Sequence, residues 1–139
     1  GWLAHNNYPQ PGGDNWFADF ALMLAWGTPS YISWMWCDGL PPSGHFAEMQ
    51  AFSRAYRQLP LGVYKTLKKH DGCFLRASER AFYLVETQGR SAACDLPEAV
   101  KTGSWRDAVS GERVGTSPTS AAQVTLKPYG FRVFLREQP

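Results

Sequence analysis

The chain has 139 residues, and its hydrophobic content of 44% is ample for a packed core, which excludes a disordered chain. The net charge is only +2 and the basic residues are scattered, so the sequence predicts no nucleic-acid partner. No apolar run reaches the roughly 18 residues of a membrane span, so we also expect no membrane partner. No signal peptide is visible at the start of the sequence, but in a fragment this absence carries no information about secretion.

Tryptophan and basic residues divide the chain into two parts. Five of the six tryptophans precede Pro60, whereas most lysines and arginines follow it. This shift in composition indicates two structural units, which we place at residues 1–61 and 62–139.

The first unit opens with a predicted helix. Asp14 suits its N-cap, because a carboxylate can accept hydrogen bonds from the free amides of the first turn. Apolar residues recur at helical spacing as far as Leu24. Gly27 suits the C-terminal position and Pro29 prevents the helix from continuing, so the helix is expected to end there.

A strand and a second helix complete the first unit. Residues 30–36 are aromatic and β-branched and have the length of one strand. After a loop, Ser43 can cap a helix that ends at Pro60. Its predicted apolar stripe consists of Phe46, Met49, Phe52, Tyr56 and Leu59. We therefore expect a helix–strand–helix unit in residues 1–61.

The second unit has a strand pattern. Short apolar and β-branched runs are separated by turn residues such as Gln88-Gly89 and Ser110-Gly111. The runs cover residues 63–67, 73–77, 80–87, 91–100, 105–114 and 124–136, the last of them broken at Pro128-Tyr129-Gly130. This spacing predicts an antiparallel β-sandwich of seven or eight strands. The predicted fold class is therefore α+β.

The three cysteines have no zinc-site spacing, and the sequence shows no metal site and no cofactor motif. Cys73 and Cys94 can form a disulfide if their strands are neighbours. The alternative is two buried free thiols, which behave as small apolar side chains.

The C-terminal motifs carry a family resemblance. Residues 105–114 (WRDAVSGERV) and 124–136 (VTLKPYGFRVFLR) resemble the C-terminal β-sandwich that follows the catalytic barrel in many glycoside hydrolases. Residues 25–34 (AWGTPSYISW) resemble the entry to the last strand of a (β/α)8 barrel, and residues 50–60 (QAFSRAYRQLP) resemble its last helix. The resemblance implies the C-terminal region of a larger enzyme, because a full barrel needs roughly 250 residues.

Two tryptophans are candidate sugar contacts. Trp34 and Trp36 alternate along the predicted strand, so they lie on the same face. In enzymes of this resemblance, the last barrel strand commonly supplies an aromatic platform for a sugar ring. The competing interpretation is that both indoles belong to the core.

Three polar residues complete the candidate site. Asp38 follows the strand at the end where barrel active sites gather, although it also suits a turn before Gly39. His5 and Asn7 precede the first helix and would reach the same rim of the barrel, unless they are ordinary loop residues. No carboxylate pair suited to glycoside hydrolysis is evident, so we assign no catalytic residue.

The sequence therefore predicts a C-terminal fragment of a glycoside hydrolase with a carbohydrate partner, inactive in isolation. A non-catalytic carbohydrate-binding module is an alternative, and exposed Tyr83, Trp105 and Tyr129 on one face would favour it. A structural or interaction module is a third class. The clustered tryptophans also predict a homodimer through residues 14–59. The localisation of this chain stays open; the resemblance is compatible with a secreted or periplasmic parent.

Overall fold

A computed structural model describes residues 21–22, 24–25, 46–70, 72–115 and 123–137 of the chain. The first helical residues in it are Ala21, Leu22, Leu24 and Ala25, which fall within the first helix predicted above. Helix α2, Phe46–Arg57, coincides with the second predicted helix. The predicted strand at residues 30–36 lies outside the described residues, so the complete helix–strand–helix unit remains a prediction.

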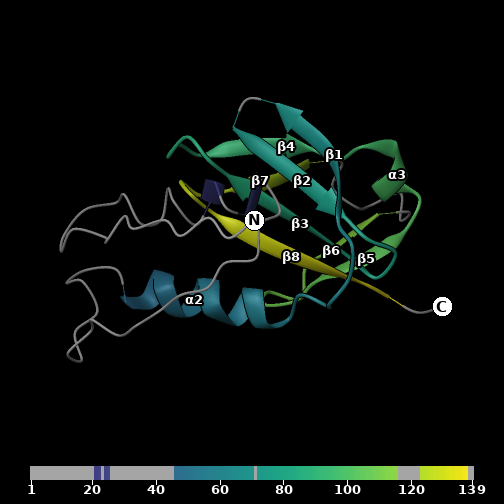
Figure 1. The fold of residues 1–139 in the computed structure, drawn as a ribbon, viewed down its shortest axis with the longest axis horizontal. Coiled ribbons are helices and arrows are strands. Elements are labelled where there is room, and N and C mark those ends of the chain that lie inside the picture. The colour runs from purple at the N-terminus through teal and green to yellow at the C-terminus, as the bar shows by residue number, and fades with distance from the viewer. Residues whose placement is uncertain (1–20, 23, 26–45, 71, 116–122, 138–139) are drawn as a thin grey trace.

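Within the described residues the second part of the chain forms eight strands and one short helix, α3 (Figure 1). Their bounds are β1 Lys65–His70, β2 Cys73–Ala77, β3 Ala81–Glu86, β4 Ala92–Asp95, α3 Glu98–Lys101, β5 Ser104–Asp107, β6 Arg113–Gly115, β7 Gln123–Leu126 and β8 Phe131–Arg136. Six strands form one sheet in the order β1-β2-β3-β8-β5-β6, and β4 pairs with β7 in a second sheet. Every pairing is antiparallel, as the turn pattern predicted.

Two predicted runs differ from the observed elements. The strand expected at 63–67 begins at Lys65 and extends to His70, the last residue before the β1–β2 turn. The run expected at 91–100 ends as a strand at Asp95 and continues as α3. Pro97 explains the second difference, since it has no amide for a strand ladder and its carbonyl accepts hydrogen bonds from the amides of Val100 and Lys101.

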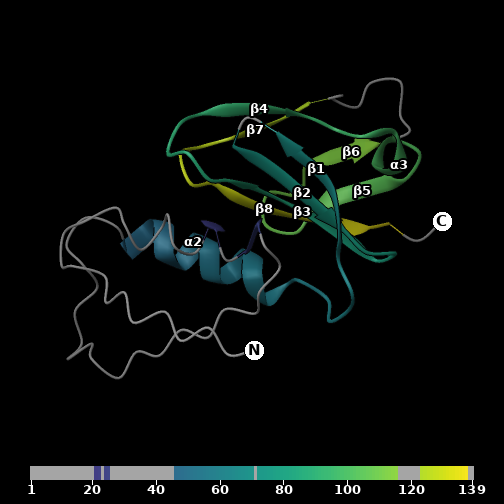
Figure 2. The same cartoon turned by 45° about the horizontal axis from the view of Figure 1, so that its top comes forward.

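The large sheet is covered on both faces. Figure 2 shows α2 on one side of it and the β4–β7 sheet on the other. Strand β3 alternates between these layers: Phe82 and Leu84 join the core beneath β4 and β7, while Tyr83 and Val85 face the helical segments. All six residues of β3 are therefore buried, and the strand is an almost continuous apolar run.

The helical segments share a core with the large sheet. Ala21, Leu24, Ala25 and Ala55 are buried in a cluster with Tyr83, Val85 and Val133. The Tyr83 hydroxyl donates a hydrogen bond of 2.7 Å to the Leu24 carbonyl, and burial raises the pKa of Tyr83 to about 12. The helices are thus attached to the sheet through apolar packing and one buried polar contact.

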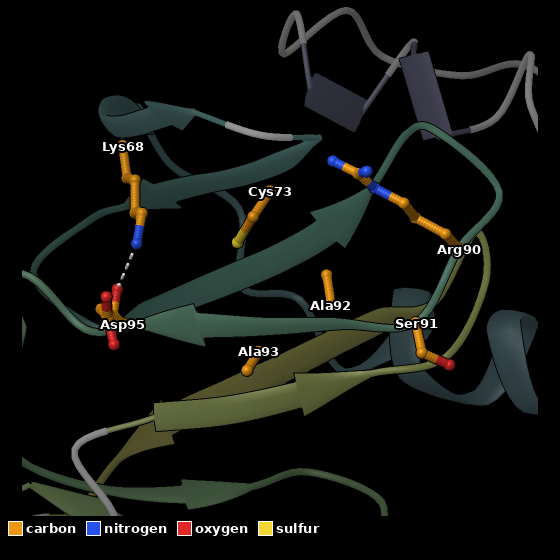
Figure 3. A pocket seen from close by; sticks show the side chains of 7 residues that line it. All are labelled: Lys68, Cys73, Arg90, Ser91, Ala92, Ala93 and Asp95. Atoms are coloured by element: carbon orange, nitrogen blue, oxygen red, sulfur yellow. Dashed lines mark hydrogen bonds between the residues drawn. The ribbon is translucent and has the colours of Figure 1, made fainter.

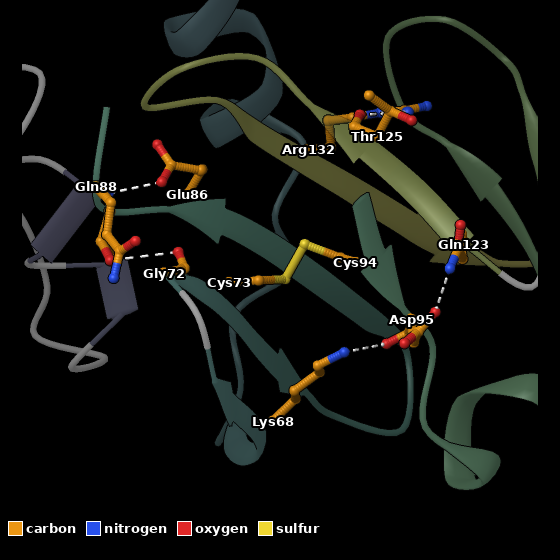
Figure 4. The surroundings of a disulfide bond; sticks show 11 residues. Lys68, Gly72, Cys73, Glu86, Gln88, Cys94, Asp95, Gln123, Thr125 and Arg132 are labelled. Atoms are coloured by element: carbon orange, nitrogen blue, oxygen red, sulfur yellow. Dashed lines mark hydrogen bonds between the residues drawn. A yellow bond between two sulfur atoms is a disulfide. The ribbon is translucent and has the colours of Figure 1, made fainter. Parts of the chain in front are cut away.

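A disulfide joins the two sheets. Cys73 lies on β2 and Cys94 on β4; their Cα atoms are 6.2 Å apart, and both residues are buried in the core between the sheets (Figure 4). Of the two alternatives that the sequence left open, the structure shows the disulfide. The loop that the disulfide closes contains β3, so the bridge joins the strand before β3 to the strand after it.

Removing this bridge should lower the free energy of unfolding by about 3 kcal/mol, because a loop of 21 residues is no longer closed in the unfolded chain. Guanidinium denaturation of a Cys73→Ala/Cys94→Ala variant, beside the oxidised and reduced wild type, measures the loss. Reductant should destabilise the wild type and leave the variant unchanged. Equal stability of oxidised and reduced wild type would contradict the prediction.

Candidate functional site

The sugar-contact residues predicted from sequence lie in the N-terminal part of the chain. Trp34, Trp36, Asp38, His5 and Asn7 are all outside the described residues. Their roles therefore remain predictions. The described residues instead show two buried carboxylates and an open hollow beside the disulfide.

The first buried carboxylate is that of Glu86, at the end of β3. It is fully buried and accepts four backbone hydrogen bonds. Its Oε1 accepts from the amide of Gln88 at 2.6 Å, and its Oε2 accepts from the amides of Gly89 at 2.8 Å, Arg90 at 3.2 Å and Tyr129 at 2.9 Å. Oriented amide dipoles thus compensate for the desolvation of the carboxylate.

A third turn packs against the same carboxylate. Gly72 closes the β1–β2 turn with a φ of +78°, a value that favours glycine. A Cβ atom there would lie 3.0 Å from Glu86 Oε1 and 2.8 Å from a carbon of Gln88. Glu86 therefore holds the β3–β4 and β7–β8 turns by hydrogen bonds and sits against the β1–β2 turn.

The second buried carboxylate, that of Asp107, shapes the β5–β6 turn. It accepts 2.8 Å hydrogen bonds from the amides of Val109 and Ser110, and a 2.7 Å bond from Arg132 Nε. Arg132 also pairs with Glu112. Burial by itself would raise the pKa of Asp107, but the two amides and the guanidinium together hold the pKa below its ordinary value.

Both carboxylates stabilise turns through hydrogen bonds to backbone amides, and neither lines the hollow described below. Across the described residues no group of His, Cys, Asp or Glu side chains is arranged to hold a metal ion. None of the helices in this part of the chain is long and apolar enough to cross a membrane. The described region thus shows neither a catalytic pair nor a metal centre.

The aromatic residues that would have marked a binding face are not exposed together. Tyr83 is 3% exposed and Trp105 is 4% exposed. The Trp105 indole donates to the Val100 carbonyl at 2.7 Å, and its ring packs edge-on against Phe82. Tyr129 is partly buried over Gly89. These side chains form core and turn contacts, so they do not provide a flat sugar platform.

An open hollow of about 450 Å³ lies between the β1–β2 hairpin and β4 (Figure 3). Its lining comprises Lys68, Cys73, Arg90, Ser91, Ala92, Ala93 and Asp95. Figure 3 shows Lys68 and Asp95 at one end and Arg90 at the other. Lys68 Nζ donates to the Asp95 carbonyl at 3.0 Å, and the Asp95 carboxylate accepts from Gln123 Nε2 at 2.6 Å.

Sequence reasoning identified neither Glu86 nor the hollow. A carboxylate two residues before the Gln88-Gly89 turn is a local signal for a turn-capping acceptor. The hollow has no such signal, because Lys68 and Arg90 come from different turns and strands and meet only in the folded chain.

Replacing Glu86 by Gln should lower the free energy of unfolding by about 2–3 kcal/mol, since the amide group turns an NH2 toward backbone donors and leaves them unpaired. Urea denaturation gives the loss, and hydrogen exchange should accelerate at the Gly89 and Tyr129 amides. Glu98→Gln is the matched control. Glu98 is exposed, and among the described residues its carboxylate pairs with Lys101 alone, so its loss should stay below about 0.5 kcal/mol. Equal losses in the two variants would contradict the role of Glu86.

No protein-family model matches the chain, and a search of the curated proteins finds no relative of significant similarity. Among solved structures, two putative α-galactosidases from Bacteroides fragilis share its fold. One matches with a TM-score of 0.58 and 16% identity over 90% of this chain and 29% of its own. The other, also described as a melibiase, matches with a TM-score of 0.54 and 18% identity over 89% of this chain and 28% of its own.

The structure of AmyP in complex with maltose matches less well, with a TM-score of 0.46 and 18% identity over 56% of this chain and 17% of AmyP. The chain spans less than a third of the length of either Bacteroides fragilis structure. At these identities the likeness concerns the fold. The two Bacteroides fragilis structures with this fold are described as putative α-galactosidases, which are glycoside hydrolases, the class that the C-terminal motifs of the chain resemble.

Proposed function

We propose that the chain is the C-terminal region of a glycoside hydrolase that acts on a poly- or oligosaccharide. The observation that carries the proposal is the match of fold over 89–90% of this chain with two proteins more than three times its length. The match includes far more than the residues of the sandwich alone. In this proposal, residues 1–61 complete the end of a (β/α)8 barrel and residues 62–139 form the sandwich that supports it.

The contact between the helices and the large sheet supports the proposed role of the sandwich as a support for the barrel end. Ala55 of α2 is buried, and the aromatic rings of Tyr56 and Phe131 lie 6.4 Å apart across the interface. After α2, the Tyr64 hydroxyl donates to the Pro60 carbonyl at 2.7 Å and fixes the connection to β1. A sheet attached in this way can brace the helices that precede it.

The sugar contacts belong to the first unit in this proposal. Trp34 and Trp36 provide aromatic faces on the last barrel strand, and Asp38, His5 and Asn7 provide hydrogen-bonding groups at the same rim. The catalytic carboxylates belong to the part of the parent enzyme outside this chain. The structural engagement of both buried carboxylates, Glu86 and Asp107, supports that assignment.

The burial of Tyr83 and Trp105 argues against the alternative of a free-standing carbohydrate-binding module that uses this aromatic set. Modules of that kind need flat aromatic surface in contact with solvent. No observation among the described residues favours this alternative over the first proposal.

The isolated chain should hydrolyse no aryl glycoside or polysaccharide. In the longer parent protein, Trp36→Ala should raise KM about tenfold with a smaller change in kcat, since a stacked aromatic contributes on the order of 1–1.5 kcal/mol. Steady-state kinetics on an oligosaccharide series measures both constants, with Val109→Ala, a change at an exposed apolar side chain of the β5–β6 turn, as the control. Turnover by the isolated chain that a single Asp or Glu substitution abolishes would overturn the proposal.

The isolated chain should also self-associate through residues 14–59. A barrel strand without its neighbours leaves backbone groups and indole surface unpaired, and a symmetric dimer covers both. Light scattering over a range of concentrations should show a dimer, and it should show a smaller fraction of dimer for Trp34→Ser/Trp36→Ser. A strictly monomeric chain at high micromolar concentration would contradict this prediction.

A further inference from the structure

We propose that the hollow between the β1–β2 hairpin and β4 is a binding subsite for an acidic sugar unit, one that carries a carboxylate or a sulfate. The inference rests on the proposed function, because a carbohydrate-acting parent supplies the sugar. It adds a second contact with substrate, on the sandwich and separate from the tryptophans of the first unit.

Small residues line the hollow along β4. Ser91 lies just before β4 and Ala92 and Ala93 begin it; Figure 3 shows the Ala92 side chain pointing toward Cys73 and the Ala93 side chain on the other side of the strand. Its volume of about 450 Å³ falls in the range of small-ligand sites. The space is therefore sufficient for a sugar unit that approaches from solvent.

Two cations from separate elements border this space. Lys68 comes from β1 and Arg90 from the β3–β4 turn. In the described part of the chain, the Arg90 guanidinium makes neither a hydrogen bond nor an ion pair. A guanidinium has a planar fork of donors that matches the oxygens of a carboxylate or sulfate, so Arg90 is the group suited to the anion.

The opposite end of the hollow has a different character. Lys68 uses one donor on the Asp95 carbonyl and has others to offer, while the Asp95 carboxylate accepts from Gln123 and has further lone pairs. These groups suit sugar hydroxyls, which both donate and accept. The Asp95 charge also disfavours an anion at this end, so the hollow should orient a ligand with its anionic group at Arg90 and its hydroxyls at Asp95.

The surroundings of the hollow hold the backbone from which these side chains extend. The Arg90 amide is bound by Glu86, which holds the turn from which the guanidinium extends. The Cys73–Cys94 disulfide joins the two strands on either side of the hollow (Figure 4). A site with a pre-formed frame loses less conformational entropy on binding, and weak individual contacts can then add up to measurable affinity.

The test is a titration of the full chain, followed by amide chemical shifts and by calorimetry. The probes are a neutral disaccharide, its uronate counterpart, its sulfated counterpart and inorganic sulfate alone. We expect an acidic disaccharide to bind at least tenfold more tightly than the neutral one, with shifts concentrated at residues 90–95. Preference for the uronate or for the sulfate ester identifies the anionic group.

Arg90→Gln keeps the backbone amide that Glu86 binds and should weaken acidic-sugar binding about tenfold, the effect of one lost charge-assisted contact. Arg106→Gln is the matched control. Arg106 is an exposed arginine on β5, which β3 and β8 separate from the β1–β2 hairpin in the strand order of the large sheet, so the variant should bind as the wild type does. Retention of full affinity in Arg90→Gln would overturn the subsite. So would equal affinity for inorganic sulfate and the acidic sugars, or no binding at millimolar ligand.

Kinetics of the longer parent protein separate this proposal from the proposed function. Hydrolysis of glycosides together with absent acidic-sugar binding at the hollow would reject the subsite and keep the glycoside hydrolase. Binding at the hollow in a parent that hydrolyses no glycoside would support the subsite chemistry and reject the enzymatic proposal.

Discussion

The turns at one end of the large sheet depend on a single buried carboxylate. Glu86 has no cation beside it among its hydrogen-bond partners; four backbone amides from two turns supply the compensation instead. This arrangement demands that the turns after β3 and between β7 and β8 keep their shape, since any opening would leave a desolvated charge without donors. The turn after β3 leads into β4, so the contacts of Glu86, together with the Cys73–Cys94 disulfide, connect the second sheet to the large one.

The second organising feature is that the large sheet serves two layers at once. Along β3, the side chains of Phe82 and Leu84 belong to the core with β4 and β7, and those of Tyr83 and Val85 belong to the core with the helices. A substitution at Phe82 or Leu84 therefore affects the packing between the two sheets. A substitution at Tyr83 or Val85 affects the packing of the helices on the large sheet. In the proposed enzyme, β3 would contact the end of the barrel through one face and the second sheet of the sandwich through the other.

Local patterns predicted the strands well, because turn residues and alternation are encoded over a few neighbours. The run at Cys73–Ala77 and the breaks at Ser110-Gly111 and Pro128-Tyr129-Gly130 were all read from adjacent residues. Pairing was less accessible: β7 and β8 are consecutive, yet β7 pairs with β4 and β8 with β3 and β5. The hollow could not be predicted either, since its cations converge through tertiary packing. Trp34, Trp36, Asp38, His5 and Asn7 remain predictions.

The place of β8 in the sheet order has a consequence for how the molecule folds. β8 is the last strand described along the chain, yet it lies between β3 and β5, and its partner residues are separated from it by long stretches of sequence. Closing such distant pairs costs loop entropy before any contact repays it, which slows folding. Without β8, the strand order would fall into two parts, β1-β2-β3 and β5-β6, each with an unpaired edge where β8 lies in the folded sheet. The complete large sheet therefore cannot form until the chain has been synthesised at least as far as Arg136, the last residue of β8.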